Sequence, residues 1–101
     1  MKLLGRSSNS NVVELNESFK NYDAIYVSSF IKERMNHTKV STSIFAFSED
    51  INVGDNIVLL KESTYTAWNK VLLTISSETS FKVMASNTTI KYYTTVIGIN
   101  L

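Results

Sequence analysis

Apolar and polar residues alternate along much of this chain with the two-residue period of a β-strand. A strand is predicted where Ile25, Val27 and Ile31 fall on one face and Tyr26 and Phe30 fall on the other. Apolar residues on both faces are typical of a strand at the centre of a sandwich, or of one that a partner covers. We therefore expect this strand to be central in a sandwich or to be covered by a partner.

Other segments share the strand-like pattern and are separated by turn-forming residues at intervals of about 8–12 residues. They comprise residues 2–4, 11–15, 40–47, 57–60, 71–76, 81–85 and 90–99. A Ser-rich turn is expected over residues 6–10, a single helical turn between 16 and 22, and a loop over 48–56. The spacing predicts an all-β fold, a small antiparallel β-sandwich of about eight strands that is jelly-roll-like and forms one domain over residues 1–101.

The composition also favours an all-β fold. Val, Ile and Thr account for 28 of the 101 residues, and Tyr and Phe account for ten more. These side chains suit a pleated surface, whereas their restricted χ1 angle makes helices less favourable. Ser, Thr and Asn together number 34 against four Ala, and Ser and Asn favour turns.

Charge and special residues exclude most cofactor chemistry. The chain has ten basic and nine acidic residues. The resulting net charge of +1 gives no indication that the protein binds nucleic acid or an anionic membrane. The absence of cysteine excludes disulfides, thiolate metal sites and cysteine nucleophiles. Three glycines are too few for a phosphate-binding glycine-rich loop. No apolar run approaches the roughly 18 residues of a membrane span, and we expect no cofactor.

Candidate catalytic groups are sparse. The one histidine, His37, follows a predicted hairpin turn and is interpreted as an exposed residue rather than a general base. Glu49, Asp50 and Asp55 could supply paired carboxylates for glycoside hydrolysis or oxygen ligands for Ca²⁺, but their spacing matches neither arrangement. A polar loop that closes on Gly54 accounts for them, so the sequence predicts a protein that is not an enzyme.

A small basic neighbourhood surrounds the hairpin that carries His37. Lys32, Arg34 and Lys39 lie close together in the sequence, and Glu33 interrupts them. We interpret them as a solvated hairpin tip, with nucleic-acid binding as the less favoured alternative.

The segment 63–70 has the chemistry of a saccharide-binding surface. It places Trp68, the one tryptophan, and Tyr65 among small hydroxylated residues, with the amide of Asn69 beside them. Flat aromatic rings pack on the apolar C–H face of a sugar, and amides and hydroxyls bond its hydroxyl groups. Tyr65, Trp68 and Asn69 are therefore the candidate ligand-binding residues. The alternative is that Trp68 begins the next strand and caps the core, with Tyr65 packed beside it.

Both ends of the chain carry a recognisable pattern. Residues 11–27 combine a short strand, a polar turn that ends in Tyr22-Asp23, and a hydrophobic strand. Residues 79–85 lead through a polar turn into residues 90–93 and then into Val96-Ile97-Gly98-Ile99. This arrangement resembles the C-terminal domains of tail fibres and tailspikes from tailed bacteriophages, which often close on an Ile-Ile-Gly-Ile-like sequence. The position of Trp68 before a strand also fits the resemblance.

The resemblance implies a virion protein, made in the cytoplasm of the bacterial host, that trimerises a tail fibre, binds host surface glycan, or both. Its partners would be two further copies of itself, other tail proteins, and a host polysaccharide or lipopolysaccharide. Charge balance and hydropathy predict no nucleic-acid partner and no membrane insertion. A purely structural trimerisation or assembly domain is the alternative, and a hydrolase of surface polysaccharide ranks third.

Strand patterning favours an oligomer independently of the resemblance. The last strand is apolar on both sides, with one set comprising Ile90, Tyr92 and Val96 and the other comprising Tyr93, Ile97 and Ile99. A two-layer sandwich of 101 residues has one interior, so a monomer with two apolar faces would expose a patch that monomers rarely tolerate. The alternative is that a bulge turns some of these residues inward. Three-fold closure rests on the fibre resemblance, because dimers are commoner.

Overall fold

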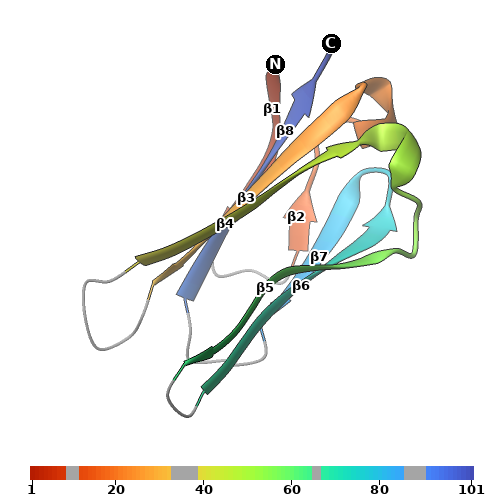
Figure 1. Cartoon of the computed structure of the whole chain (residues 1–101). Coiled ribbons are helices and arrows are strands. Elements are labelled where there is room, and N and C mark those ends of the chain that lie inside the picture. The colour runs from red at the N-terminus through yellow and green to blue at the C-terminus, as the bar shows by residue number, and fades with distance from the viewer. Residues whose placement is uncertain (9–11, 33–38, 65–66, 86–90) are drawn as a thin grey trace.

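The structure is a computed structural model of the chain, and it describes residues 1–8, 12–32, 39–64, 67–85 and 91–101. For residues 8, 31–32, 39–40, 60–64, 67–70, 85 and 91–92 it describes the backbone alone. The strands are β1 (Lys2–Ser8), β2 (Val12–Glu14), β3 (Ala24–Lys32), β4 (Lys39–Phe47), β5 (Asn56–Thr64), β6 (Ala67–Ser77), β7 (Ser80–Ala85) and β8 (Lys91–Ile99) (Figure 1). Two 3-10 helical turns are η1 (Phe19–Asn21) and η2 (Ser48–Asp50).

The strands form two antiparallel sheets of four, and these confirm the predicted all-β sandwich of eight strands. Sheet A has the order β1-β8-β3-β4 and sheet B the order β2-β7-β6-β5. The strand predicted to be central, β3, lies between β8 and β4. The last two strands of the chain, β7 and β8, each lie inside a sheet, so both sheets depend on the C-terminal part of the sequence.

Three segments differ from the sequence-based expectation. Residues 6–8 were expected in a Ser-rich turn, but they continue β1, because Arg6, Ser7 and Ser8 pair with Thr95, Thr94 and Tyr93 of β8. The predicted loop 48–56 contains η2. The segment 63–70 was placed between two strands, but Ser63 and Thr64 end β5 and residues 67–70 begin β6. Turn-forming residues are compatible with strands when a neighbouring strand supplies the backbone hydrogen bonds.

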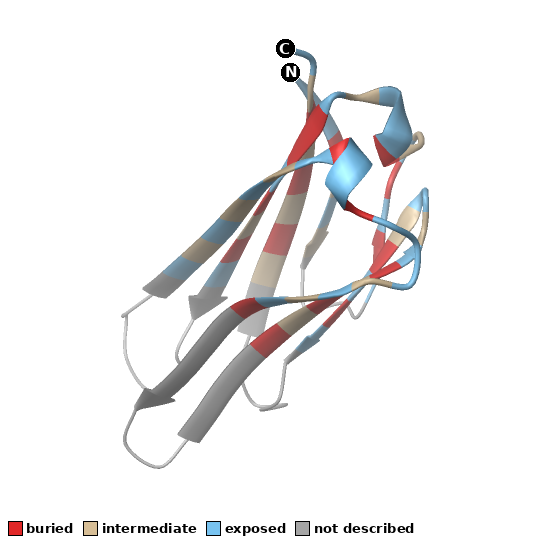
Figure 2. Cartoon of the chain, turned by 45° about the vertical axis from the view of Figure 1, so that its right-hand side comes forward, coloured by how far each residue is buried: buried red, intermediate tan, exposed pale blue. Residues whose placement is uncertain are grey.

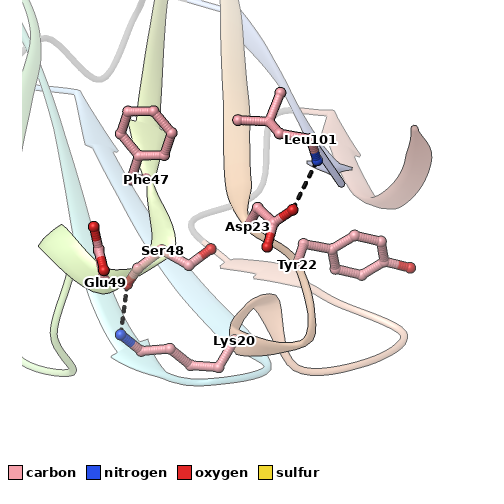
Figure 3. A pocket seen from close by; sticks show the side chains of 7 residues that line it. All are labelled: Lys20, Tyr22, Asp23, Phe47, Ser48, Glu49 and Leu101. Atoms are coloured by element: carbon pink, nitrogen blue, oxygen red, sulfur yellow. Dashed lines mark hydrogen bonds between the residues drawn. The ribbon is translucent and has the colours of Figure 1, made fainter.

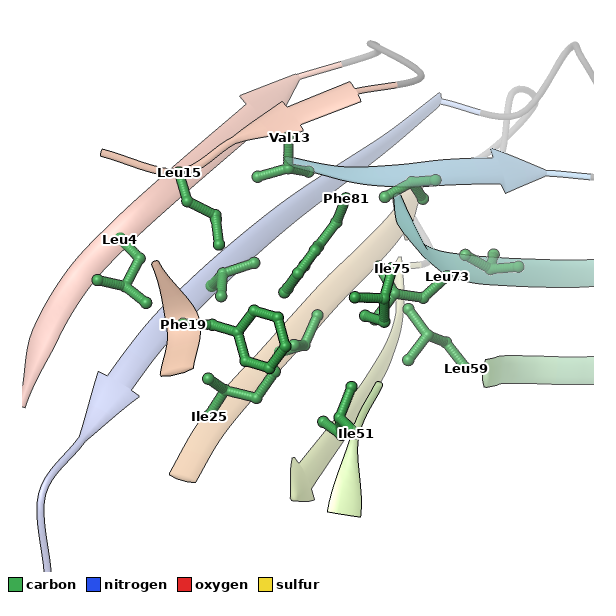
Figure 4. Close-up of a cluster of buried hydrophobic side chains, with 14 residues drawn as sticks. Leu4, Val13, Leu15, Phe19, Ile25, Ile51, Leu59, Leu73, Ile75 and Phe81 are labelled. Atoms are coloured by element: carbon green, nitrogen blue, oxygen red, sulfur yellow. The ribbon is translucent and has the colours of Figure 1, made fainter. Parts of the chain in front are cut away.

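The alternation of burial along the strands matches the predicted two-residue period (Figure 2). In β3, Ile25 and Val27 are fully buried while Tyr26 and Phe30 are exposed. The apolar core between the sheets is shown in part in Figure 4 and comprises Leu4, Val13, Leu15, Phe19, Ile25, Val27, Ile51, Leu59, Val71, Leu73, Ile75, Phe81, Val83 and Val96. The inward-facing side chains of both sheets therefore pack into a single core, as a two-layer sandwich requires.

Phe19 enters this core from η1 rather than from a strand. Its ring is fully buried and packs edge to face on Phe81 of β7, with ring centroids 5.5 Å apart. The turn is closed by Ser18, whose Oγ accepts a hydrogen bond from the Lys20 backbone N–H at 3.1 Å. This side-chain cap satisfies one of the backbone donors that a helical start leaves free.

A pair of hydroxyl groups lies inside the sandwich where sequence patterning predicted none. Ser29 of β3 and Thr94 of β8 are cross-strand partners, both fully buried, and their hydroxyl oxygens are 2.9 Å apart. Thr42 of β4 donates its hydroxyl proton to the carbonyl of Leu59 on β5 and so links the two sheets. Hydrogen bonding offsets the cost of burying these polar groups.

The sandwich is elongated and its two ends differ. The principal extents are 40 × 23 × 21 Å, and the N- and C-termini lie side by side at one end (Figure 1). We call this the proximal end; it also holds η1 and η2. The opposite end, where β3, β5 and β7 finish and β4, β6 and β8 begin, we call the distal end. The candidate residues Trp68 and Asn69 lie near the start of β6 and so belong to the distal end.

Gly98 of β8 has a ring packed against it. A Cβ at this position would lie 2.6 to 2.8 Å from the Cγ, Cδ1 and Cδ2 atoms of Tyr22. These are atoms at the base of the ring, so they have little freedom to move. The glycine of the Val96-Ile97-Gly98-Ile99 segment is therefore required by the close approach of Tyr22.

We expect Gly98→Ala to lower the free energy of unfolding by about 1–3 kcal/mol, because the added methyl group overpacks the Tyr22 contact. Urea unfolding measures this change. Thr95→Ala, at an outward position of the same strand, is the control and should change stability by less than about 0.5 kcal/mol. Combining Gly98→Ala with Tyr22→Ala should cost less than the sum of the single changes. Simple additivity would show that the two residues do not touch.

Candidate functional site

The outer face of sheet A is apolar and aromatic, and we call it the aromatic face. Its residues are Leu3, Tyr26, Phe30, Phe45, Phe47, Tyr93, Ile97 and Ile99. Five of them, Leu3, Tyr26, Phe30, Phe45 and Phe47, each expose between 36% and 53% of their surface. The sequence placed Tyr26 and Phe30 on the face of β3 opposite Ile25 and Val27, and Ile97 on the face of β8 opposite Val96; the structure turns the faces with Tyr26, Phe30 and Ile97 outward.

One apolar row crosses the whole sheet. Leu3 pairs with Ile97, Ile97 with Tyr26, and Tyr26 with Phe45, so the row runs through β1, β8, β3 and β4. Phe47 lies next to this row, and its ring meets the ring of Phe45 edge to face with centroids 5.5 Å apart. Directly opposed aromatic and β-branched residues stabilise a sheet. The row is therefore a continuous surface and not a set of isolated exposed residues.

A band of hydroxyl groups lies next to the apolar row. Ser28 is the cross-strand partner of Thr95 on one side and of Ser43 on the other. Beyond the band, Phe30 pairs with Tyr93. The aromatic face thus combines flat rings with short hydroxylated side chains.

Charge distinguishes the outer faces of the two sheets. Within the described strands of sheet A there is no Asp or Glu, and the basic residues are Lys2, Arg6, Lys32, Lys39 and Lys91. The outer face of sheet B carries both signs: Lys82 and Glu14 are exposed, and Ser80 bonds the Glu14 carboxylate at 3.3 Å. Charges of both signs are typical of a solvated face, whereas the aromatic enrichment of sheet A is typical of the core of a protein interface.

A cavity of about 600 Å³ lies at the proximal end, between η1, η2 and the last residue of the chain (Figure 3). Two of its charged side chains, Lys20 and Asp23, form hydrogen bonds with the backbone. The Lys20 ammonium donates to the carbonyls of Ser48 and Ile51, both at 2.6 Å, and the Asp23 carboxylate accepts the Leu101 backbone N–H at 2.7 Å. These bonds connect η1 to η2 and to the C-terminal residue. The residues that line the cavity therefore have a structural role in holding these segments together.

The pKa shifts at the proximal end do not create an acid–base pair. Hydrogen bonding within the Lys2–Glu17 ion pair, 2.6 Å long, raises the pKa of Lys2 and lowers the pKa of Glu17. Burial, and then hydrogen bonding to Glu17, raises the pKa of Tyr22. All three shifts move the pKa away from neutral pH, whereas a general acid or base works best with a pKa near it.

The candidate carboxylates of the sequence are not brought together as a catalytic pair. Glu49 and Asp50 are exposed in η2. The Asp55 carboxylate accepts the Asn52 backbone N–H at 2.8 Å, and Gly54 has a positive φ of 98°, so this segment is a tight turn that closes on Gly54. Among the described residues, no group of three His, Asp or Glu side chains could hold a metal ion.

The candidate saccharide-binding residues are described in part. Trp68 and Asn69 lie in β6, opposite Ser63 and Glu62 of β5. Tyr65 lies outside the described residues, as do Arg34 and His37. The backbone therefore places Trp68 and Asn69 on one strand at the distal end.

Comparison of the chain with protein-family models, with curated proteins and with solved structures finds no match. Within the described residues, no helix is long and apolar enough to span a membrane. The case for a function therefore rests on the chain itself.

Proposed function

We propose that this chain is a non-catalytic domain from the distal tip of a bacteriophage tail fibre or tailspike, and that it binds host surface glycan as a homotrimer. One observation carries the proposal: the termini lie at one end of a sandwich 40 Å long, and the candidate ligand-binding residues Trp68 and Asn69 lie on a strand that begins at the other end. A domain at a fibre tip is attached at one end and presents its binding residues at the other. Trp68 and Asn69 have that position relative to the termini.

The aromatic face supports self-association. An aromatic side chain covers roughly 150–250 Å², so the exposed parts of Tyr26, Phe30, Phe45 and Phe47 leave on the order of 350 Å² of aromatic surface. Leu3 adds to this area. A standard interface buries about 800 Å² on each partner, of which roughly 60% is apolar. The aromatic face thus supplies most of the apolar area that such an interface needs, and a second copy would bury it without opposing any acidic group.

The alternative is a purely structural trimerisation domain of a tail protein with no ligand. The aromatic face favours this alternative as much as it favours the first proposal, because self-association requires no glycan. The two functions differ in what the distal end does, and a binding assay separates them.

We expect Trp68→Ala to abolish glycan binding and to leave the melting temperature within a few degrees of wild type. The reason is that sugar rings stack on exposed aromatic rings. A glycan array and thermal unfolding measure the two effects, and Trp68→Phe, which keeps a ring, should retain part of the binding. A loss of about 3–5 kcal/mol in stability would identify Trp68 as a core residue instead and remove it from the binding site.

We expect no turnover of polysaccharide. The sequence spacing of the candidate carboxylates matches no glycosidase arrangement, so release of reducing ends should stay at the level of a buffer control. Asp50→Asn and Asp55→Asn are the informative variants, since both residues lie in the segment singled out for possible hydrolysis. Reducing ends that wild type releases and either variant does not would show that the domain is an enzyme.

We expect light scattering at micromolar concentration to give three times the chain mass of 11.4 kDa. Phe45→Lys should convert the protein to monomer, because it places a charge in the apolar row. Val58→Lys is the matched control: Val58 is 48% exposed and Phe45 50%, but Val58 belongs to sheet B. A wild-type monomer at every concentration, or equal effects of both variants, would refute the aromatic face as the interface.

A further inference from the structure

The strand register brings three lysines into one row at the distal end of sheet A. Lys32 of β3 is the cross-strand partner of Lys39 on β4 and also of Lys91 on β8. The sequence gives no sign of this row, because Lys39 and Lys91 lie in different strands far apart along the chain. Only the pairing of β8 with β3 joins them.

Sheet B repeats the arrangement. Lys61 of β5 is the cross-strand partner of Lys70 on β6, and the next pair toward the distal end is Glu62 with Asn69. Among the described residues of the distal end there are thus five lysines, with Glu62 the one acidic residue near them.

The acidic residues gather at the other end. All of them except Glu33 and Glu62 lie in or beside the turns and strand ends of the proximal end, and they comprise Glu14, Glu17, Asp23, Glu49, Asp50, Asp55 and Glu78. The net charge of +1 therefore hides a separation of charge along the 40 Å axis of the molecule.

The proximal acids are too far away to neutralise the distal lysines. Charges are screened over about 10 Å at 0.1 M salt, and the molecule is 40 Å long. Like charges at directly opposite positions of neighbouring strands destabilise a sheet. The rows Lys91-Lys32-Lys39 and Lys61-Lys70 place like charges at opposed positions of neighbouring strands, and an anion at the distal end would offset their repulsion.

We infer that the distal end binds the anionic groups of a glycan, phosphate or carboxylate, through the row Lys32, Lys39 and Lys91 of sheet A, with Lys61 and Lys70 as a second, separate pair on sheet B. This inference rests on the proposed glycan-binding function and names the class of glycan. Lysine is a compact point charge that binds either anion without the fixed geometry of arginine. Lys70 also directly follows the candidate residue Asn69 in β6 and is two residues from Trp68. One of the lysines and two of the candidate sugar-binding residues therefore lie on the same strand.

A long nucleic acid fits the same charges less well. A nucleic-acid surface carries basic residues along a stripe or a whole face, and the domain is usually basic overall. Here five of the ten basic residues lie at the distal end of a chain with a net charge of +1, and seven of the nine acidic residues lie toward the other end. A short charged portion of a glycan can contact the row of three lysines on sheet A.

The test compares immobilised glycans that differ in charge, with the full chain as analyte. The surfaces are lipopolysaccharide, the same lipopolysaccharide after chemical dephosphorylation, alginate as a carboxylated polysaccharide, and dextran as a neutral one; single-stranded DNA and polyphosphate are added as competitors. The variant replaces Lys32, Lys39 and Lys91 by Gln. The control, matched in charge, replaces Lys2, Arg6 and Lys82 by Gln, and these residues lie outside the distal end.

We expect tight binding to lipopolysaccharide or alginate and weak binding to dextran. Affinity should fall on the order of tenfold between about 50 and about 200 mM salt, as expected when a few charge contacts are screened. The distal triple variant should lose on the order of tenfold in affinity at low salt, with the control unchanged. Its melting temperature should not fall below that of wild type, because repulsion within the lysine row is removed.

Three results would overturn the inference. The first is equal affinity of the wild-type protein for charged and neutral glycans. The second is a loss of affinity in the control variant equal to that in the distal triple variant. Stronger competition by DNA than by soluble lipopolysaccharide would assign the lysines to nucleic acid. Binding to dextran that requires Trp68 but not the lysines would leave the proposed function standing without this inference. Binding to polyphosphate and to no glycan would keep the anion site and overturn the glycan-binding function.

Discussion

The insertion of Phe19 between the two sheets is the contact on which the proximal end of the molecule depends. Its ring is fully buried against Phe81, and it comes from a turn of three residues. Because the turn is so short, the buried position of Phe19 also sets the positions of Lys20 and Tyr22. Lys20 donates hydrogen bonds to two carbonyls at η2, and Tyr22 packs on Gly98. One aromatic side chain thus holds together both sheets, both helical turns and the last strand.

The same contact gives a physical meaning to the two sequence patterns at the ends of the chain. Tyr22 packs on Gly98, and Asp23 accepts the backbone N–H of Leu101, so the Tyr-Asp turn and the glycine-containing last strand form one structural unit. A ring that lies flat on a strand requires glycine beneath it, and a free backbone N–H at the end of a strand requires an acceptor. Packing therefore accounts for these residue types in this chain, whatever its biological setting.

Alternation was enough to predict the sandwich and the division of β3 into one face with Ile25 and Val27 and another with Tyr26 and Phe30, because local periodicity reports which side chains share a face. It did not show which of these two apolar faces is buried. It could not predict the buried Ser29–Thr94 pair, since two hydroxyl groups satisfy each other only after β3 and β8 pair. The pairing of Lys32 with Lys91 was missed for the same reason: it depends on the register of β8 against β3, and no local window of sequence contains both residues. The basic neighbourhood around the first hairpin supplies Lys32 and Lys39, and β8 adds Lys91 beside them.

The separation of charge and the position of the termini reinforce each other. A protein whose charges are divided along its long axis is oriented by the field of an anionic surface, with the basic end leading. In this molecule the basic end is the distal one and both termini lie at the other end. The orientation that electrostatics favours therefore turns the termini away from the surface, where a fibre would continue.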